Sequence, residues 1–300
     1  MGKIHQAIRR AEQEARLLSR KAEAQGQNPD SRYLRTIAPH PVMYMDVSRP
    51  HLVQGTPMTA STPEVEHGAF VDLRPSPTVV AISAPKSFAG QQYGILKRKL
   101  CSIKEERDLG TILITSASTS EGKTLTAVNL AFTIAQGIDQ RVLLVDANLK
   151  RPHVESLLGF SAAKGLADYL SGKTSNEEII LRTRVSNLSI ASSGHVAEDP
   201  TGLLNGQAMT DFLAYTRERF DWVILDSPPL SPLAEVDLLS SLVDGILIVV
   251  RHSHTPLDLI SKSMQVLSGR KLLGCLFNGV PVPDKDLSRE KTPRRRTVTS

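Results

Sequence analysis

The segment Ala117-Ser118-Thr119-Ser120-Glu121-Gly122-Lys123-Thr124 decides the fold of this 300-residue chain. An apolar run typical of a buried strand, residues 111–115, precedes it, and an amphipathic helical pattern begins directly after it. In a phosphate-binding loop, successive backbone N–H groups surround the anion while the following helix directs its positive end towards the same place. The order strand, loop and helix therefore predicts a nucleotide phosphate site to which all eight residues contribute.

Three residues of this loop have specific chemical uses. Gly122 permits a close approach of the backbone to phosphate, Lys123 can reach the β- and γ-phosphates, and the Thr124 hydroxyl is placed to ligate Mg²⁺. Ala117 stands where the usual eight-residue pattern begins with glycine. A bare G-K-T triplet also occurs in ordinary turns between strand and helix, so the interpretation depends on the flanking pattern and on the downstream strands.

Two downstream strands each end in an aspartate. Asp146 closes the apolar run 142–146, and Asp226 closes the run 223–226. Ligands of parallel sheets bind outside the carboxyl ends of the strands, so both carboxylates are expected beside the loop. Carboxylates there hold a metal ion and orient the nucleophile, although either residue alone could be a turn former or a helix cap. The predicted catalytic residues are Lys123, Asp146 and Asp226, and the predicted metal ligands are Thr124, Asp146 and Asp226.

The domain that contains these motifs is predicted to span residues 86–281. Apolar strands alternate there with amphipathic helices, which is the pattern of a parallel sheet covered on both faces. We therefore predict an α/β fold with a doubly wound, mostly parallel sheet of the P-loop NTPase type. Strands are expected at residues 111–116, 141–146, 188–191, 222–226, 245–250 and 273–277.

Three further segments flank the predicted domain. Residues 1–23 carry apolar side chains at spacings of three and four, which predicts an amphipathic N-terminal helix. Residues 24–85 hold nine of the 18 prolines and keep no period, so a disordered, flexible linker is expected. Residues 282–300 are polar and basic and predict a disordered tail. The N-terminal helix could pack on a partner, lie on anionic lipid or stay solvated.

Composition restricts the cellular setting. Cys101 and Cys275 fit no zinc pattern, so a reducing cytosol is expected rather than a disulfide framework. The longest late apolar run, residues 245–250, is far shorter than the roughly 20 residues of a membrane-spanning helix. A formal charge of +5 is modest and leaves nucleic acid, anionic lipid or neither open as a partner. We expect a cytoplasmic protein that does not itself cross the membrane.

The motifs together resemble a known family, the bacterial tyrosine kinases of capsule and exopolysaccharide systems, which are P-loop ATPases related to the partition and division-site ATPases. The resemblance covers about residues 85–281. Beyond the phosphate loop, it rests on V-L-L-V-D-A-N-L-K-R-P at 142–152, K-G-L-A-D-Y-L-S-G at 164–172 and V-I-L-D-S-P-P at 223–229. Ser118 stands where the partition ATPases usually carry a second lysine, which favours the polysaccharide branch.

The resemblance implies ATP and Mg²⁺ as cofactors and phosphorylation of tyrosine as the reaction. Asp146 would activate the incoming hydroxyl or hold the metal, and Asp226 would complete the metal shell. Arg151 would contact phosphate and Asn278 adenine, with a helix cap and a turn residue as the respective alternatives. The implied partner is a separate transmembrane chain-length protein at the inner face of the cytoplasmic membrane. A homo-oligomer stays open, and no specific nucleic acid is expected.

Three features depart from the pattern of that family. The five tyrosines all precede residue 216, so residues 216–300 lack the tail cluster of tyrosines that relatives phosphorylate. Gln91 and Gly94 replace the acid and the first arginine of an E-x-x-R-x-x-R helix that builds ring contacts, and Lys97 alone keeps its charge. Asn148 stands where many relatives have a second aspartate.

Three functions are compatible with these features. The first is an ATP-dependent tyrosine-kinase-type enzyme that controls polysaccharide polymerisation or export. The second is a non-kinase switch whose nucleotide state is read by a membrane partner, which the missing tail tyrosines favour. The third is a partition or positioning ATPase, against which Ser118 argues.

Overall fold

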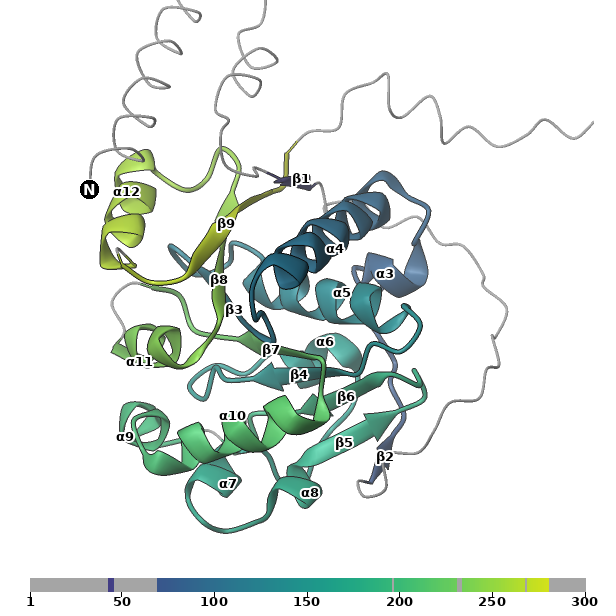
Figure 1. Cartoon of the computed structure of the whole chain (residues 1–300), viewed down its shortest axis with the longest axis vertical. Helices are drawn as coiled ribbons and strands as arrows, with labels where there is room; N and C mark the ends of the chain where they lie inside the picture. Colours follow the sequence, from purple (N-terminus) through teal and green to yellow (C-terminus); the bar gives the residue numbers. More distant parts are fainter. Residues whose placement is uncertain (1–42, 46–68, 196, 231–233, 268, 281–300) are drawn as a thin grey trace, which may run out of the picture. The chain divides into compact units, whose positions relative to one another are not determined.

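The computed structural model describes residues 43–45, 69–195, 197–230, 234–267 and 269–280. The predicted N-terminal helix (1–23), most of the predicted linker and the predicted tail (282–300) lie outside these residues. One short strand, β1 (Met43–Met45), is separated in the sequence from the other described residues. The continuous description of the α/β domain begins at residue 69 (Figure 1).

The domain is built on a sheet whose strands lie in the order β9-β8-β3-β7-β4-β6-β5-β2 (Figure 1). All neighbouring pairs in this order are parallel except β5 and β6. Every residue of β3, β4 and β7 is buried, because a parallel sheet has helices on both faces. The strands are β2 (Phe70–Val71), β3 (Thr111–Ser116), β4 (Val142–Asp146), β5 (Ile180–Thr183), β6 (Leu188–Ala191), β7 (Trp222–Asp226), β8 (Gly245–Arg251) and β9 (Leu272–Asn278).

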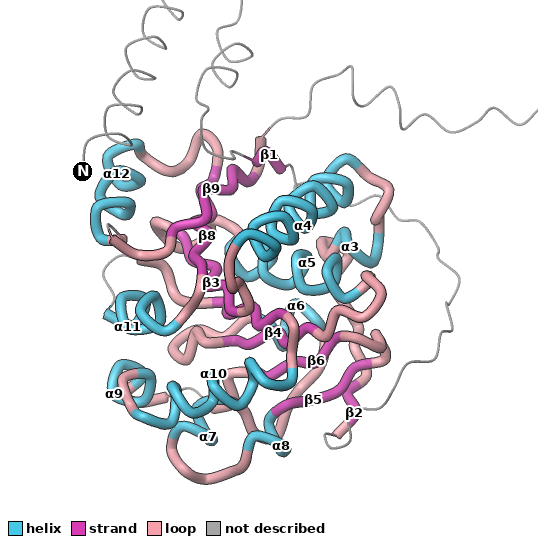
Figure 2. Tube along the Cα trace, viewed as in Figure 1, coloured by secondary structure: helices cyan, strands magenta, loops and turns pink. Residues whose placement is uncertain are grey.

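Helices cover the two faces of this sheet (Figure 2). On one side α5 packs on β3, β4 and β7, and α3 and α4 pack on α5. On the other side α10 contacts β7 and α11 contacts β3. The helices are α3 (Val80–Ser83), α4 (Phe88–Glu106), α5 (Lys123–Ala135), α6 (Val154–Leu158), α7 (Leu166–Leu170), α8 (Asn176–Ile179), α9 (Pro200–Leu204), α10 (Gln207–Arg219), α11 (Ala234–Leu242) and α12 (Leu257–Val266).

The predicted fold class is confirmed by this arrangement. All six predicted strands are present, and their ends differ from the prediction by no more than one residue. The structure adds β2 and β5 to these six strands. Strand β5 was not predicted because it follows α8 without an intervening turn. Its antiparallel pairing with β6 leaves the rest of the sheet parallel.

The prediction that a flexible linker continues to residue 85 is wrong for residues 69–85. Strand β2 pairs with β5, and the backbone N–H of Arg74 donates to the carbonyl of Leu158 at 2.8 Å. The Asn129 side chain accepts a hydrogen bond from the Ala81 amide at 2.9 Å, which attaches α3 to α5. Proline-rich backbone has no sequence period, so periodicity could not reveal a segment that is held by hydrogen bonds to its neighbours.

Candidate functional site

The predicted phosphate-binding loop joins β3 to α5. Ser120 and Gly122 adopt left-handed backbone angles, with φ of 62° and 94°, and α5 begins at Lys123. A side chain at Gly122 would place its Cβ 2.1 Å from Nδ2 of Asn278, and residues with side chains rarely adopt this φ. Glycine is therefore the residue that fits at this position.

The side chain of Glu121 is fully buried and holds the loop from within. Its Oε2 accepts a hydrogen bond from the Ser118 amide at 3.1 Å, and its Oε1 accepts one from the Ser118 hydroxyl at 3.0 Å. The hydroxyl of Thr255 also donates to Oε1. A carboxylate engaged in this way braces the loop, so any contact of Glu121 with phosphate has to come from its backbone.

Two carboxylates lie together at the carboxyl ends of the central strands. Asp146 on β4 is the register partner of Asp226 on β7, and both side chains are buried. The hydroxyl of Thr124, at the start of α5, donates to Oδ2 of Asp226 at 2.6 Å. The structure thus brings together the loop, its threonine and both predicted aspartates.

Asp146 is held by backbone donors. The amide of Asn148 donates to its Oδ1 at 3.1 Å, and the amides of His153 and Val154 donate to its Oδ2, each at 3.0 Å. Burial raises the pKa of Asp146, while these three amides and the charge of Lys123 act in the opposite direction. The amides fix the orientation of a carboxylate that the sequence identified only by its place at a strand end.

Asp226 has fewer donors than Asp146. Its pKa is raised to about 7, chiefly by burial and also by the charge of Asp146, while Lys123 and the Thr124 hydroxyl act to lower it. Its Oδ1 is buried and has no hydrogen-bond partner among the described residues. A buried carboxylate oxygen without a partner is costly, and a cation would satisfy it.

These residues fit a magnesium ion that is held jointly with phosphates. Thr124 and Asp226 supply two adjacent oxygen ligands, one of them the free Oδ1. The described residues contain no group of three or more His, Cys, Asp or Glu side chains that could hold a metal by themselves. Mg²⁺ usually binds one or two protein ligands together with substrate phosphates and water, and this donor set matches that requirement.

Two residues outside the loop, Arg151 and Asn278, were predicted to contact the nucleotide. The side chain of Arg151 is exposed, while its backbone pairs with Asn148, which accepts from the Arg151 amide and donates to its carbonyl. Asn278 is buried and uses Nδ2 to donate to the Glu121 carbonyl at 2.9 Å, which leaves its Oδ1 without a partner among the described residues. The phosphate role of Arg151 and the adenine role of Asn278 stay predictions.

Sequence reasoning missed one ion pair beside the site. Lys150 lies 2.8 Å from Oε1 of Glu235, whose side chain is 2% exposed. This pair joins the segment after β4 to α11. A lysine shortly after a strand and an acid in a distant helix carry no sequence signal that would pair them.

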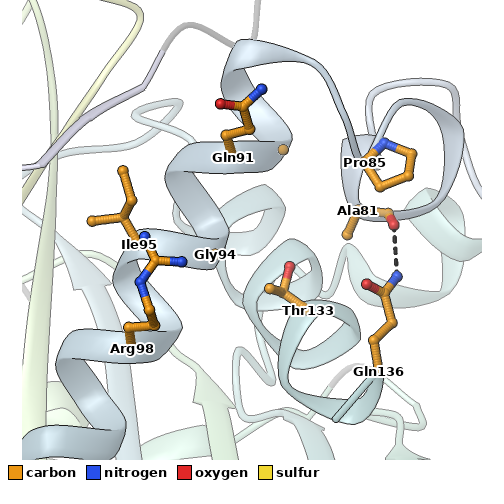
Figure 3. Close-up of a pocket in the computed structure, with 9 residues that line it drawn as sticks. Ala81, Pro85, Gln91, Gly94, Ile95, Arg98, Thr133 and Gln136 are labelled. Carbon is orange, nitrogen blue, oxygen red and sulfur yellow. Dashed lines mark hydrogen bonds between the residues drawn. The ribbon is translucent and has the colours of Figure 1, made fainter.

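A cavity of about 310 Å³ lies between α3, α4 and α5, and its lining includes no residue of the phosphate loop (Figure 3). Its lining includes Gln91, Gly94 and Arg98 of α4 and Gln136, which donates to the Ala81 carbonyl at 2.8 Å. Helix α4 carries Gln91, Gly94 and Lys97 at the positions of the E-x-x-R-x-x-R motif.

The one charge that α4 keeps from this motif points inward. Nζ of Lys97 donates to the carbonyls of Thr133 and Ile134 at 3.2 and 3.3 Å, at the carboxyl end of α5. Lys97 therefore neutralises the negative end of a neighbouring helix of its own chain.

A parallel sheet with a phosphate loop and two strand-end carboxylates defines a P-loop nucleotide-binding ATPase domain. An AAA domain family model matches residues 109–268, and tyrosine-protein kinase YwqD of Bacillus subtilis is 31% identical over 203 residues, covering 67% of this chain and 85% of YwqD. The chain belongs to the bacterial tyrosine kinases of this class.

A second relative and its solved structure agree with this assignment. Tyrosine-protein kinase etk of Escherichia coli K12 is 30% identical over 203 residues, which span 67% of this chain and 28% of etk. The kinase domain of Escherichia coli tyrosine kinase ETK has a TM-score of 0.65 at 30% identity, covering 67% of this chain and 80% of that domain. No helix among the described residues is both long enough and apolar enough to traverse a bilayer.

Proposed function

We propose that this protein is an ATP- and Mg²⁺-dependent tyrosine-kinase-type regulator of exopolysaccharide or capsule polymerisation or export. The observation that carries the proposal is the contact of Thr124 with Asp226, whose second oxygen is buried without a partner among the described residues, directly beside Asp146. Membership of the tyrosine-kinase family supports phosphoryl transfer to tyrosine as the reaction of this site.

The loop and the two aspartates would have separate roles in phosphoryl transfer. Lys123 would contact the β- and γ-phosphates, and Thr124 with Asp226 would hold the metal. Bound Mg²⁺ would supply neutralisation of the phosphate charge. Asp146, oriented by three amides, would accept the phenol proton as the tyrosine oxygen bonds to the γ-phosphorus and the bond to the ADP oxygen breaks.

The membrane partner belongs to the same proposal. Relatives such as etk are much longer than this chain, which spans 28% of etk. We propose that a separate transmembrane chain-length protein binds this chain and holds it at the inner face of the cytoplasmic membrane. Assembly of identical subunits through α4 has less support, because Lys97 forms its hydrogen bonds within its own chain.

The test uses γ-labelled ATP and Mg²⁺ with the full chain, alone and with the cytosolic segment of a candidate chain-length protein. We expect label on tyrosine in the wild type and none in Lys123→Ala. Lys173→Ala is the matched control, because Lys173 is exposed and lies outside the phosphate loop. Nucleotide binding without labelled tyrosine in either arm would contradict the kinase activity.

A second candidate is an ATP-dependent switch without kinase activity, which the lack of tyrosine in residues 216–300 favours. The same assay separates the two functions. Release of inorganic phosphate that depends on Lys123, with no phosphotyrosine, supports the switch. Phosphotyrosine on this chain or on the partner supports the kinase.

A further inference from the structure

The segment that begins at the end of β8 packs directly behind the phosphate loop. Nη1 of Arg251 donates to the carbonyl of Ser120 at 3.2 Å. The amide of Arg251 donates to the Thr255 hydroxyl oxygen at 3.2 Å, and that hydroxyl donates to Glu121. The amide of His252 donates to the carbonyl of Asn278 at 2.8 Å. We call residues 251–255 the brace segment.

The brace segment and Asn278 of β9 together hold the carbonyl side of the loop backbone. Arg251 binds the carbonyl of Ser120, and Asn278 binds the carbonyl of Glu121 at 2.9 Å. In a phosphate-binding loop the backbone N–H groups must converge on the anion, so the carbonyls of the same peptides point away from it. Fixing two successive carbonyls therefore fixes the direction of the neighbouring amides.

The Glu121 carboxylate connects Thr255 to Ser118 at the start of the loop. One oxygen accepts from the Ser118 amide and the other from both the Ser118 and Thr255 hydroxyls. The carboxylate is fully buried, so a hydrogen bond to it is not exchanged for water when Thr255 loses its hydroxyl. Without that donor, we expect Glu121 and the Ser118 peptide to shift.

We propose that Arg251 and Thr255 are positioning residues for the nucleotide phosphates, acting through the carbonyl of Ser120 and the carboxylate of Glu121. This inference rests on the proposed function, because it assigns the phosphate loop to a nucleotide. Neither residue touches the phosphates; both set the direction of the amides that do. The brace segment reaches the loop from the end of β8, and Asn278 reaches it from the end of β9. Both strands lie on the side of β3 opposite the two aspartates.

The test compares Thr255→Val, which keeps the shape and removes the hydroxyl, with Thr255→Ser, which keeps it. Thr174→Val is a matched control, since the Thr174 hydroxyl also donates to a glutamate, Glu178, on the exposed surface. The full chain is titrated with a fluorescent ATP analogue and with ADP, and the melting temperature without nucleotide is recorded for each variant.

We expect Thr255→Val to bind both nucleotides about tenfold more weakly, which corresponds to the lower end of the range for one hydrogen bond to a charged group. Thr255→Ser restores wild-type affinity, and Thr174→Val leaves it unchanged. Thr255→Val without nucleotide melts a few degrees below the wild type, because the buried carboxylate loses one donor, and it stays folded at the assay temperature. In steady state, its KM for ATP rises while kcat at saturation changes little, because the lost contact orients the ground-state site.

Two outcomes would overturn the inference. Equal nucleotide affinity in wild type and Thr255→Val removes the positioning role while leaving the proposed function intact. Weak binding that Thr255→Ser does not restore, or that occurs only at temperatures where Thr255→Val is partly unfolded, assigns Thr255 to stability alone. If the wild type binds neither nucleotide, the proposed function itself fails, and the positioning role fails with it.

Discussion

Asp146 and Asp226 stand opposite each other on adjacent strands, and the two buried carboxylates are stabilised unequally. Asp146 receives three backbone hydrogen bonds, whereas Asp226 receives one from Thr124 and keeps an oxygen without a partner among the described residues. Like charges on neighbouring buried groups repel each other in a medium that screens poorly. A cation at this point would relieve the repulsion between the two carboxylates, which the charge of Lys123 relieves only in part.

Asp226→Asn should stabilise the protein in the absence of divalent cations. The pKa of Asp226 rises from 3.8 to about 7 on folding, so the folded state binds a proton that the unfolded state releases between these values. The free energy of unfolding of the wild type thus falls as pH rises through this window. Above this pH window, we expect the free energy of unfolding of the variant to exceed that of the wild type by an amount of the order of 2 kcal/mol.

Urea unfolding in a chelating buffer over this pH range measures the effect of Asp226→Asn. The difference between variant and wild type should be small near the lower end and grow towards neutral pH. A variant that is less stable than the wild type at every pH would show that the carboxylate contributes to stability even without a metal. With Mg²⁺ and ATP, the order should reverse, because only the wild type keeps the ligand.

Gly122→Ala should abolish nucleotide binding and destabilise the fold. The new Cβ would meet Nδ2 of Asn278 at 2.1 Å, at a φ of 94° that alanine disfavours. We expect a loss of about 1–3 kcal/mol in the free energy of unfolding. Gly172→Ala is the matched control, because Gly172 also has positive φ, 72°, but its Cβ would meet nothing within 4 Å. Equal losses of unfolding free energy in both variants would show that backbone strain, and not the contact with Asn278, causes the destabilisation.

The sequence sufficed to predict the positions of those candidate site residues that depend on strand order. Asp146 and Asp226 were predictable because parallel strands deliver their last residues to one edge, and Lys123 and Thr124 because the loop pattern has a fixed geometry. The six predicted strands were buried apolar runs of the kind that a covered parallel sheet requires.

The contacts behind the loop could not be predicted in this way. Thr255 and Arg251 lie more than 100 residues from the loop in sequence, and each makes its contact through one hydrogen bond that leaves no periodic signal. Residues 69–85 were misassigned for a related reason. Backbone hydrogen bonds such as that from Arg74 to Leu158 do not depend on side-chain type, so composition pointed to a linker.

Lys97→Met should lower stability without altering nucleotide affinity. Nζ of Lys97 donates hydrogen bonds to the carbonyls of Thr133 and Ile134 at the carboxyl end of α5. A positive charge there interacts favourably with the negative end of the helix dipole. Methionine keeps the apolar stem and loses these bonds, so we expect a loss of about 0.5–1.5 kcal/mol in chemical unfolding. Arg98→Met, an exposed cation on the same helix, serves as the comparison. A change in oligomeric state with Lys97→Met would instead indicate an intersubunit role.

Tyr93 should receive no phosphate even if the protein phosphorylates itself. Its side chain has no exposed surface, and burial raises its pKa above the ordinary value of tyrosine. A buried phenol must become exposed before it can reach the γ-phosphate of a neighbouring molecule, and for Tyr93 this requires α4 to move away from α5. Tyr215 is better placed, on the partly exposed surface of α10, although its hydroxyl donates to Glu177 at 3.0 Å. Mass spectrometric mapping after incubation with ATP and Mg²⁺ checks this, and Tyr93→Phe should keep the full wild-type label. Substantial phosphate on Tyr93 in protein that remains folded would contradict this prediction and would mean that the packing of α4 on α5 opens during the reaction.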